Sequence, residues 1–289
     1  MTTETPFPRA SAGRDGSRRS PASPCPLRPA VDGRWPAPFR PAFAGFFSLL
    51  AASLLGACSV VRARDAAVPA ATTQLVVVTT ASWSAPGGTL RAYERDAAGR
   101  WRAIRDPVPV TVGRAGSAWG LGLHAAQAGP QKREGDGRAP AGMFRLGTAF
   151  GYAPQAETAL PYAPMDADDW CIDVPASPLY NRLVDARDVG AAAVAGSTEP
   201  MRRDLHAGGD RRYTLGFVIE HNAAAVRDAG SCIFAHLWKE PGAPTAGCTA
   251  MDEPAMRALL AWLDHSKQPL FVLLPVDEHR RLRGPWQLP

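Results

Sequence analysis

Hydrophobic residues form one continuous run early in the chain and many short, alternating groups further along. The continuous run extends from about residue 42 to residue 57. The later groups are rich in β-branched and aromatic residues and are separated by glycine, proline and other turn-forming residues, which is typical of strands. This pattern predicts strands at 74–80, 89–93, 101–104, 108–112, 143–146, 213–219, 233–238 and 270–274.

One segment near the C-terminus has helical periodicity. Asp252 is suited to cap a first turn, and Pro254 is suited to an early helical position. The apolar stripe that follows consists of Met256, Leu259, Leu260 and Leu263. We expect this helix to pack against a sheet, and the fold to be mainly β, that is β-rich with few helices.

The first 57 residues are typical of an export leader, because an arginine-bearing, proline-rich segment precedes the apolar run. The run ends in Leu-Gly-Ala before Cys58, which resembles the bacterial lipobox, so lipidation of the Cys58 thiol is expected. An uncleaved membrane anchor is the alternative, although about 15 apolar residues are fewer than the ~20 that span a bilayer. Residues 58–73 are then a tether, and residues 74–289 form one domain outside the cytoplasm.

The net charge of +5 is concentrated in the leader. Seven arginines precede Cys58 against three acidic residues, so the remainder of the chain is nearly neutral. It has no basic stripe interleaved with aromatic residues, which a protein that binds the phosphate backbone would need. We therefore expect no nucleic-acid partner.

Three cysteines remain beyond Cys58, namely Cys171, Cys232 and Cys248. In an oxidising compartment, an odd cysteine is either unpaired by chance or kept free for chemistry. A disulfide between Cys171 and Cys232 is possible, but their spacing does not establish that their α-carbons approach each other. The chain has no CxxC pair, and a four-ligand zinc site would need scattered residues, so we expect neither a metal nor another cofactor.

A histidine on a predicted strand and a cysteine in the following loop form the candidate site. His236 can accept the thiol proton of Cys248 if the intervening loop folds back. Gly247 leaves the approach to the sulfur open, and the backbone around Thr245 and Gly247 can direct N–H groups at a developing oxyanion. The alternative is that Cys248 is a small buried hydrophobic residue and His236 a core histidine.

Residues 233–251, IFAHLWKEPGAPTAGCTAM, resemble the active-site block of the YkuD-type L,D-transpeptidases. The resemblance implies that Cys248 is a nucleophile and that His236 is its base. Residues 132–144, KREGDGRAPAGMF, are similar to the TPxG-F lead-in of the family, with alanine in place of threonine. The resemblance extends over roughly residues 74–275, and its specific part is confined to these two blocks.

The chain also departs from the family pattern. Many relatives have Ser-His-Gly-Cys and an arginine two positions later, whereas this chain has Thr-Ala-Gly-Cys at 245–248 and then Ala250. The missing histidine and arginine imply that a substrate carboxylate is bound elsewhere, which leaves the acceptor specificity open.

The resemblance implies a YkuD-like fold and a cell-wall substrate. Cys248 would attack the third, meso-diaminopimelate-type residue of a peptidoglycan stem tetrapeptide, expel D-alanine, and pass the acyl group to an amine. Two alternatives remain open: a hydrolase of the same family (a stem carboxypeptidase or an amidase that releases wall proteins), and a non-catalytic lipoprotein that binds peptidoglycan. The expected location is the periplasm, with the protein held at a membrane by the lipid on Cys58.

Other polar residues are weaker candidates. His221 and Asn222 follow a predicted strand and could line the cleft, although a structural turn is the favoured interpretation. Cys232 is a rival thiol that lacks a neighbouring glycine. Glu134 and Asp136 lie in a glycine-rich loop, where we expect solvated turn residues.

Overall fold

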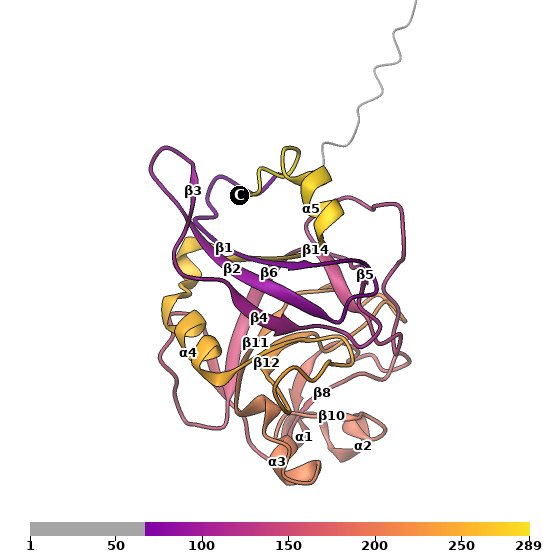
Figure 1. Cartoon of the computed structure of the whole chain (residues 1–289). Helices are drawn as coiled ribbons and strands as arrows, with labels where there is room; N and C mark the ends of the chain where they lie inside the picture. The colour runs from indigo at the N-terminus through magenta and orange to yellow at the C-terminus, as the bar shows by residue number, and fades with distance from the viewer. Residues whose placement is uncertain (1–66) are drawn as a thin grey trace, which may run out of the picture. The chain divides into compact units, whose positions relative to one another are not determined.

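The structure is a computed structural model that describes residues 67–289 (Figure 1). Strands predominate and the helices are few, so the predicted mainly β class is confirmed. The predicted leader (1–57), the lipidation site Cys58 and most of the tether lie outside the described residues. Within residues 67–289, no helix has the length and apolar composition needed to cross a bilayer.

Eight of the described strands form a closed ring, because β1 (Gln74–Thr80) pairs along both of its edges. It runs parallel to β14 (Leu270–Pro275) and antiparallel to β2 (Gly87–Arg95). From β14 the ring continues through β6 (Ala139–Gly151), β11 (Leu215–Ile219), β12 (Phe234–Leu237), β13 (Thr249–Met251) and β4 (Val108–Thr111) to β2. The strands β3 (Trp101–Ala103), β5 (Ser117–Trp119) and β7 (Tyr162–Pro164) pair with members of this ring.

The longest described helix, α4 (Glu253–Trp262), begins where the sequence predicts it. Its N-cap Asp252 accepts a hydrogen bond from the backbone N–H of Ala255 at 2.8 Å, and Pro254 lies in the first turn. The apolar stripe of α4 is buried, as expected. A further helix, α5 (Val276–Leu282), follows β14 and was not predicted.

The strands β6, β11 and β12 are largely buried on both of their faces, and alternate residues contribute to two separate clusters. On one face, Ala149, Phe217 and Ala235 belong to a large apolar cluster, the main core, which also contains side chains of β1, β14 and α4. The opposite face is called the site face. It carries a smaller group, the thiol cluster: Phe150, Met165, Cys171, Met201, Tyr213, Cys232, Phe234 and Cys248.

Residues 152–214, between β6 and β11, form an insertion that covers the site face. Besides β7, it contains β8 (Asp169–Cys171), β9 (Leu183–Asp185), α1 (Ala186–Val189), α2 (Ala191–Val194), β10 (Glu199–Pro200), α3 (Arg203–His206) and the 3-10 turn η1 (Arg212–Thr214). In Figure 1, α1, α2, α3, β8 and β10 gather at the end of the domain opposite α5. Because Met165, Met201 and Tyr213 come from the insertion, the thiol cluster lies between the insertion and the ring.

The last residues of the predicted tether are part of the packed domain. Val68 is buried, and its backbone N–H donates to the carbonyl of Trp286 at 3.0 Å. Thr72 is also buried, and the N–H of Thr73 donates to the carbonyl of Lys267 at 3.0 Å. The described domain therefore begins before Gln74, by Val68 at the latest.

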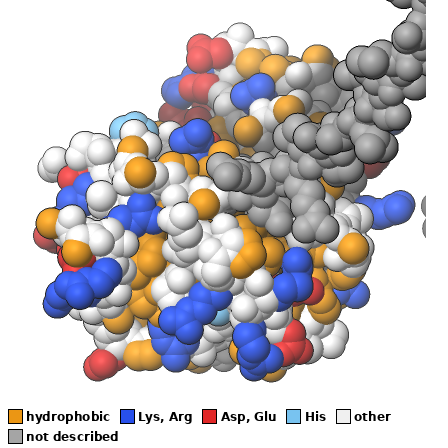
Figure 2. Space-filling model, turned by 90° about the horizontal axis from the view of Figure 1, so that it is seen from above, with side chains coloured by type: hydrophobic (Ala, Val, Ile, Leu, Met, Phe, Trp, Pro, Cys, Tyr) orange, Lys and Arg blue, Asp and Glu red, His pale blue; other side chains and the backbone are white. Residues whose placement is uncertain are grey.

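Charged side chains on one side of the domain are interspersed rather than sorted by sign. Figure 2, which views the domain from above, shows basic side chains scattered among hydrophobic and uncharged ones, with acidic side chains between them.

Candidate active site

Cys248 lies directly before β13, next to β12 on the site face. Its Sγ accepts a hydrogen bond from the N–H of Phe234 at 3.3 Å, and the thiol is 3.5 Å from the carbonyl oxygen of Cys232. The residue is 8% exposed and is the free cysteine of the described chain. The predicted nucleophile is thus a reduced thiol at the edge of a buried cluster.

His236 lies on β12, and its side chain shares the site face with Cys248. The parallel pairing of β12 and β13 sets His236 opposite Ala250, two residues after Cys248. Alternation along the strand therefore points both side chains to the same face. The two residues are one strand apart (about 4.8 Å) and two positions apart along the strand (about 6.6 Å). The fold thus places the predicted pair on adjacent strands, facing the same way.

Two contacts fix the imidazole of His236. Its Nδ1 lies 2.7 Å from the carbonyl oxygen of Leu237, which can only accept a hydrogen bond, so Nδ1 carries the proton of the neutral ring. Nε2 is then the proton acceptor, and among residues 67–289 it has no hydrogen-bond partner. The ring also meets the ring of Tyr213 in an edge-on arrangement, with 5.2 Å between centroids.

Burial keeps both members of the pair uncharged. Desolvation raises the pKa of Cys248 to about 12, and the nearby carboxylate of Glu199 acts in the same direction. Desolvation also lowers the pKa of His236 to about 4, partly opposed by the hydrogen bond to the Leu237 carbonyl. In this arrangement both groups of the site are uncharged, a thiol and a neutral imidazole, rather than a thiolate and an imidazolium.

A buried polar network from the insertion lies against the pair. The Tyr213 hydroxyl donates to the Glu199 carboxylate at 2.6 Å, and that carboxylate is ion-paired with Arg203 at 2.9 Å. Arg203 also pairs with Asp210 at 3.1 Å. Burial raises the pKa of Glu199, while the bonds to Tyr213 and Arg203 favour its ionised form. No sequence motif surrounds Tyr213 or Glu199, so neither residue could be identified as part of the site before the fold was known.

The loop before Cys248 is held by Thr245. Its hydroxyl donates to the carbonyl of Cys248 at 2.7 Å and accepts from the N–H of Gly247 at 3.1 Å. The Gly247 N–H is therefore engaged by Thr245 and is not presented to an incoming oxyanion in this arrangement. A side chain at position 247 would also approach the carbonyl oxygen of Arg138 to 3.1 Å, so glycine permits close passage of the two segments.

The two sequence blocks that carry the family resemblance meet at this point. Arg138, in the 132–144 block, lies against Gly247 in the 233–251 block. Asp136 pairs with the buried Lys132 at 2.6 Å and accepts the N–H of Arg138 at 2.9 Å, which fixes the first block. The expectation of a solvated Asp136 is therefore wrong.

Glu134 also differs from the expected solvated turn residue. Its carboxylate accepts a hydrogen bond from the hydroxyl of Ser231 at 2.7 Å and another, short one from the hydroxyl of Tyr180. Because Tyr180 belongs to the insertion and Ser231 precedes β12, Glu134 ties the insertion to the wall of the site.

His221 and Asn222 have structural roles. The Nδ1 of His221 accepts the N–H of Leu121 at 3.1 Å, and its Nε2 donates to the carbonyl of Ala229 at 2.9 Å. Burial lowers the pKa of His221 to about 4. Asn222 has a φ of 54° and donates to the carbonyl of Gly230 at 3.0 Å. Both residues thus shape the turn that precedes β12, which agrees with the favoured interpretation, and His221 also borders a cavity on the site face.

Cys171 and Cys232 form a disulfide with 5.9 Å between their α-carbons. The possibility left open by their spacing is therefore realised, and Cys232 is not a rival thiol. The bond joins β8 of the insertion to the segment directly before β12. Cys232 has a φ of 54°, so the regular strand begins only at Phe234.

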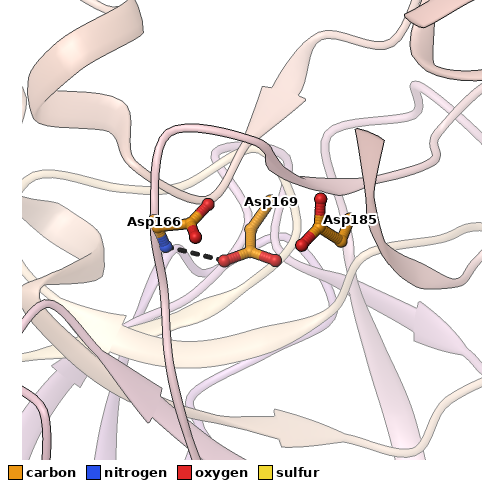
Figure 3. A group of neighbouring side chains, drawn as sticks. All are labelled: Asp166, Asp169 and Asp185. Atoms are coloured by element: carbon orange, nitrogen blue, oxygen red, sulfur yellow. Dashed lines mark hydrogen bonds between the residues drawn. The ribbon is translucent and has the colours of Figure 1, made fainter. Parts of the chain in front are cut away.

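The insertion also contains a group of carboxylates, Asp166, Asp169 and Asp185 (Figure 3). The guanidinium of Arg187 pairs with Asp166 and with Asp185, each at 2.5 Å, and the N–H of Asp166 donates to Asp169 at 2.6 Å. Asp166 and Asp185 therefore already have a cationic partner, and Asp169 is bonded within the group, so we assign no metal to these carboxylates.

Comparisons of the chain with models of protein families, with curated proteins and with solved structures found no match.

Proposed function

We propose that this protein is a YkuD-like L,D-transpeptidase, with the corresponding fold, that acts on peptidoglycan stem peptides. The observation that carries the proposal is the geometry of one pair of residues. The free thiol of Cys248 shares a face of adjacent strands with His236, whose Nε2 is the proton acceptor. The other cysteines of the described domain are joined in a disulfide, so the single thiol is available for acyl transfer.

The proposed reaction begins when the Cys248 thiol leaves the carbonyl of Cys232 and transfers its proton to Nε2 of His236. The sulfur attacks the carbonyl carbon of the third stem residue, and the tetrahedral intermediate collapses to a thioester as the protonated His236 gives its proton to the departing D-alanine. An acceptor amine then loses a proton to His236 and attacks the thioester, which releases Cys248. This reaction uses neither a metal nor an organic cofactor.

Burial of the pair dictates how the thiol is activated. With a thiol pKa of about 12 and an imidazole pKa of about 4, a resident thiolate is strongly disfavoured at neutral pH. We therefore infer that proton transfer to His236 accompanies attack on the bound substrate. Backbone N–H groups near Cys248 would stabilise the oxyanion, and the Gly247 N–H would contribute only after exchanging its bond with Thr245.

The proposed setting is the periplasmic side of the cell envelope. A lipid on Cys58 would hold the protein at a membrane, and the partners would be peptidoglycan stem peptides. A hydrolase of the same family would use water in place of the amine and would shorten stems without joining them. A non-catalytic lipoprotein would bind peptidoglycan without reacting at Cys248.

The test is incubation of the full chain with purified tetrapeptide muropeptides, beside Cys248→Ala. We expect the parent to yield 3,3-linked dimers or exchanged D-amino acids, and the variant to yield neither. Shortened stems without dimers would identify the hydrolase instead. Equal product from both proteins would reject Cys248 as the nucleophile.

A further inference from the structure

A cavity of about 350 Å³ lies on the site face beside the thiol cluster. Its floor is formed by β6, β11 and β12, and residues 181–183 of the insertion form its other wall. The disulfide Cys171–Cys232 and the side chain of Phe234 also line it. The cavity thus lies between both parts of the domain, which the disulfide joins covalently.

The cavity is next to the sulfur of Cys248. Phe234, which lines the cavity, donates its N–H to Sγ at 3.3 Å, and the carbonyl of Cys232, another lining residue, is 3.5 Å from the same sulfur. Cys248 itself precedes β13, the strand adjacent to β12. A group bound in the cavity would therefore lie one strand away from the acyl group on Cys248.

Two side chains of opposite charge line the cavity, Arg182 from the insertion and Glu220 from the end of β11. Across residues 67–289, neither side chain takes part in an ion pair or a side-chain hydrogen bond. The Glu220 carboxylate extends over Gly147, where a Cβ would lie 3.4 Å from Oε1. By contrast, the Glu199 carboxylate beside the thiol cluster is paired with Arg203.

Asn181, the other polar residue of this wall, is already occupied. Its amide donates to the carbonyls of His221 and Asn222 at 3.0 and 2.9 Å, and its oxygen accepts the N–H of Cys232 at 2.9 Å. Asn181 therefore holds residues 181–183 in place, and Arg182 and Glu220 are the charged side chains of the cavity that can bind a ligand.

We propose that this cavity binds a group that carries both an ammonium and a carboxylate, with the ammonium at Glu220 and the carboxylate at Arg182. Charge-assisted hydrogen bonds of this kind are among the stronger polar contacts in proteins. The inference rests on the proposed function, and it identifies the group as the amino-acid end of the side chain of the third stem residue. A lysine-type residue lacks the carboxylate and would leave Arg182 without a partner.

The test measures binding by calorimetry to the full chain carrying Cys248→Ala, which prevents turnover. The probes are two tetrapeptides that differ only at the third residue, meso-diaminopimelate in one and L-lysine in the other. We expect the diaminopimelate peptide to bind about tenfold more tightly, because each lost charged contact costs about 1.4 kcal/mol or more. Arg182→Gln should abolish this preference. Glu220→Gln should lower the affinity for both peptides about tenfold.

Arg280→Gln, at an exposed arginine on α5, is the matched control and should leave both affinities unchanged. A charge-swapped protein, Arg182→Glu with Glu220→Arg, should bind the diaminopimelate peptide better than Arg182→Glu alone does. The inference would be overturned if the two peptides bound equally well to the protein that carries only Cys248→Ala. An unchanged preference after the further substitution Arg182→Gln would also overturn it.

Failure of the inference can be told apart from failure of the proposed function. If a carbapenem acylates Cys248 in the otherwise unaltered chain but the peptides bind without preference, only the cavity assignment is wrong. If the preference is present but Cys248 is never acylated, only the proposed chemistry is wrong. Absence of peptide binding up to millimolar concentration would overturn the cavity assignment.

Discussion

The main core and the thiol cluster use opposite faces of the same strands, but they differ in chemical character. The main core is aliphatic and aromatic on the face of β6, β11 and β12 that carries Phe217. The thiol cluster contains the phenol of Tyr213 and lies against two further ionisable groups, the buried imidazole of His236 and the partly exposed carboxylate of Glu199. Buried polar groups are costly unless they are bonded. The insertion supplies the partners of Tyr213 and Glu199, whereas the carbonyl of Leu237 on β12 supplies the partner of His236. The residues that stabilise the fold and the residues of the candidate site thus lie on opposite faces of the same layer of strands.

The largest expected effect is loss of turnover in His236→Ala. Removal of a positioned base should lower the rate at neutral pH by about 10²–10⁴-fold. The thiol must then ionise unaided, and below its pKa of about 12 the thiolate fraction rises about tenfold per pH unit. The rate of the variant should therefore increase with pH, which dimer formation measured from pH 6 to pH 10 would reveal. Undiminished turnover at neutral pH would remove His236 from the mechanism.

A substitution in the main core should lower the stability of the protein and leave its turnover nearly unchanged. Phe271 is buried on β14, and Phe271→Ala should lower the free energy of unfolding by about 3–5 kcal/mol. Denaturant unfolding would measure this loss, and turnover per folded molecule should stay close to that of the parent. A large fall in turnover with unaltered stability would show that the two faces are not separate in function.

Removal of the disulfide tests how firmly the insertion is held on the site face. The double variant Cys171→Ser and Cys232→Ser opens a link between residues 61 positions apart, which should cost about 2–4 kcal/mol of stability. The midpoint of denaturant unfolding would measure the change. Cys248 should also react faster with iodoacetamide, because an insertion that is no longer cross-linked should expose the thiol more often. Identical unfolding and identical alkylation would show that the bond does not restrain the insertion.

The smallest expected effect is a shift in the ionisation of the thiol. Glu199→Gln removes a negative charge that raises the pKa of Cys248 and keeps a group that accepts from Tyr213. The pKa of Cys248 should fall but stay above its ordinary value, because desolvation is its main cause. The pH profile of alkylation by iodoacetamide should move to lower pH.

Tyr213→Phe is the control for this experiment. It removes the hydroxyl but keeps the Glu199 carboxylate, so the charge beside the thiol stays in place. Its alkylation profile should therefore lie nearer the profile of the parent than that of Glu199→Gln does. An unmoved profile in Glu199→Gln would contradict an electrostatic role for this carboxylate.

Local patterns predicted much of the ring. The β-branched run at 74–80 forms β1, and Asp252 caps α4, because propensity and capping act within a few residues. The pattern at 143–146 revealed only part of β6, which extends from Ala139 to Gly151. Its ends are rich in glycine and alanine, and pairing with β5, β7, β11 and β14 makes them a strand despite their low propensity.

The sequence predicted the site residues that belong to a motif, and it did not predict the others. His236 and Cys248 belong to one sequence block, and the parallel pairing of β12 and β13 gives them a common face. Tyr213 and Glu199 reach the site only through the tertiary fold of the insertion, whose strands are two or three residues long. Glu134 was wrongly expected to be solvated, because its partners lie 46 and 97 residues away.

The most direct test of the central claim is the mass of the protein after brief exposure to a diaminopimelate-containing stem tetrapeptide. We predict an adduct equal to the tripeptide acyl group, located on Cys248, with one D-alanine released for each adduct formed. The matched Cys248→Ala protein should gain no mass. An adduct on the variant, or D-alanine release without any acylated Cys248, would contradict the account.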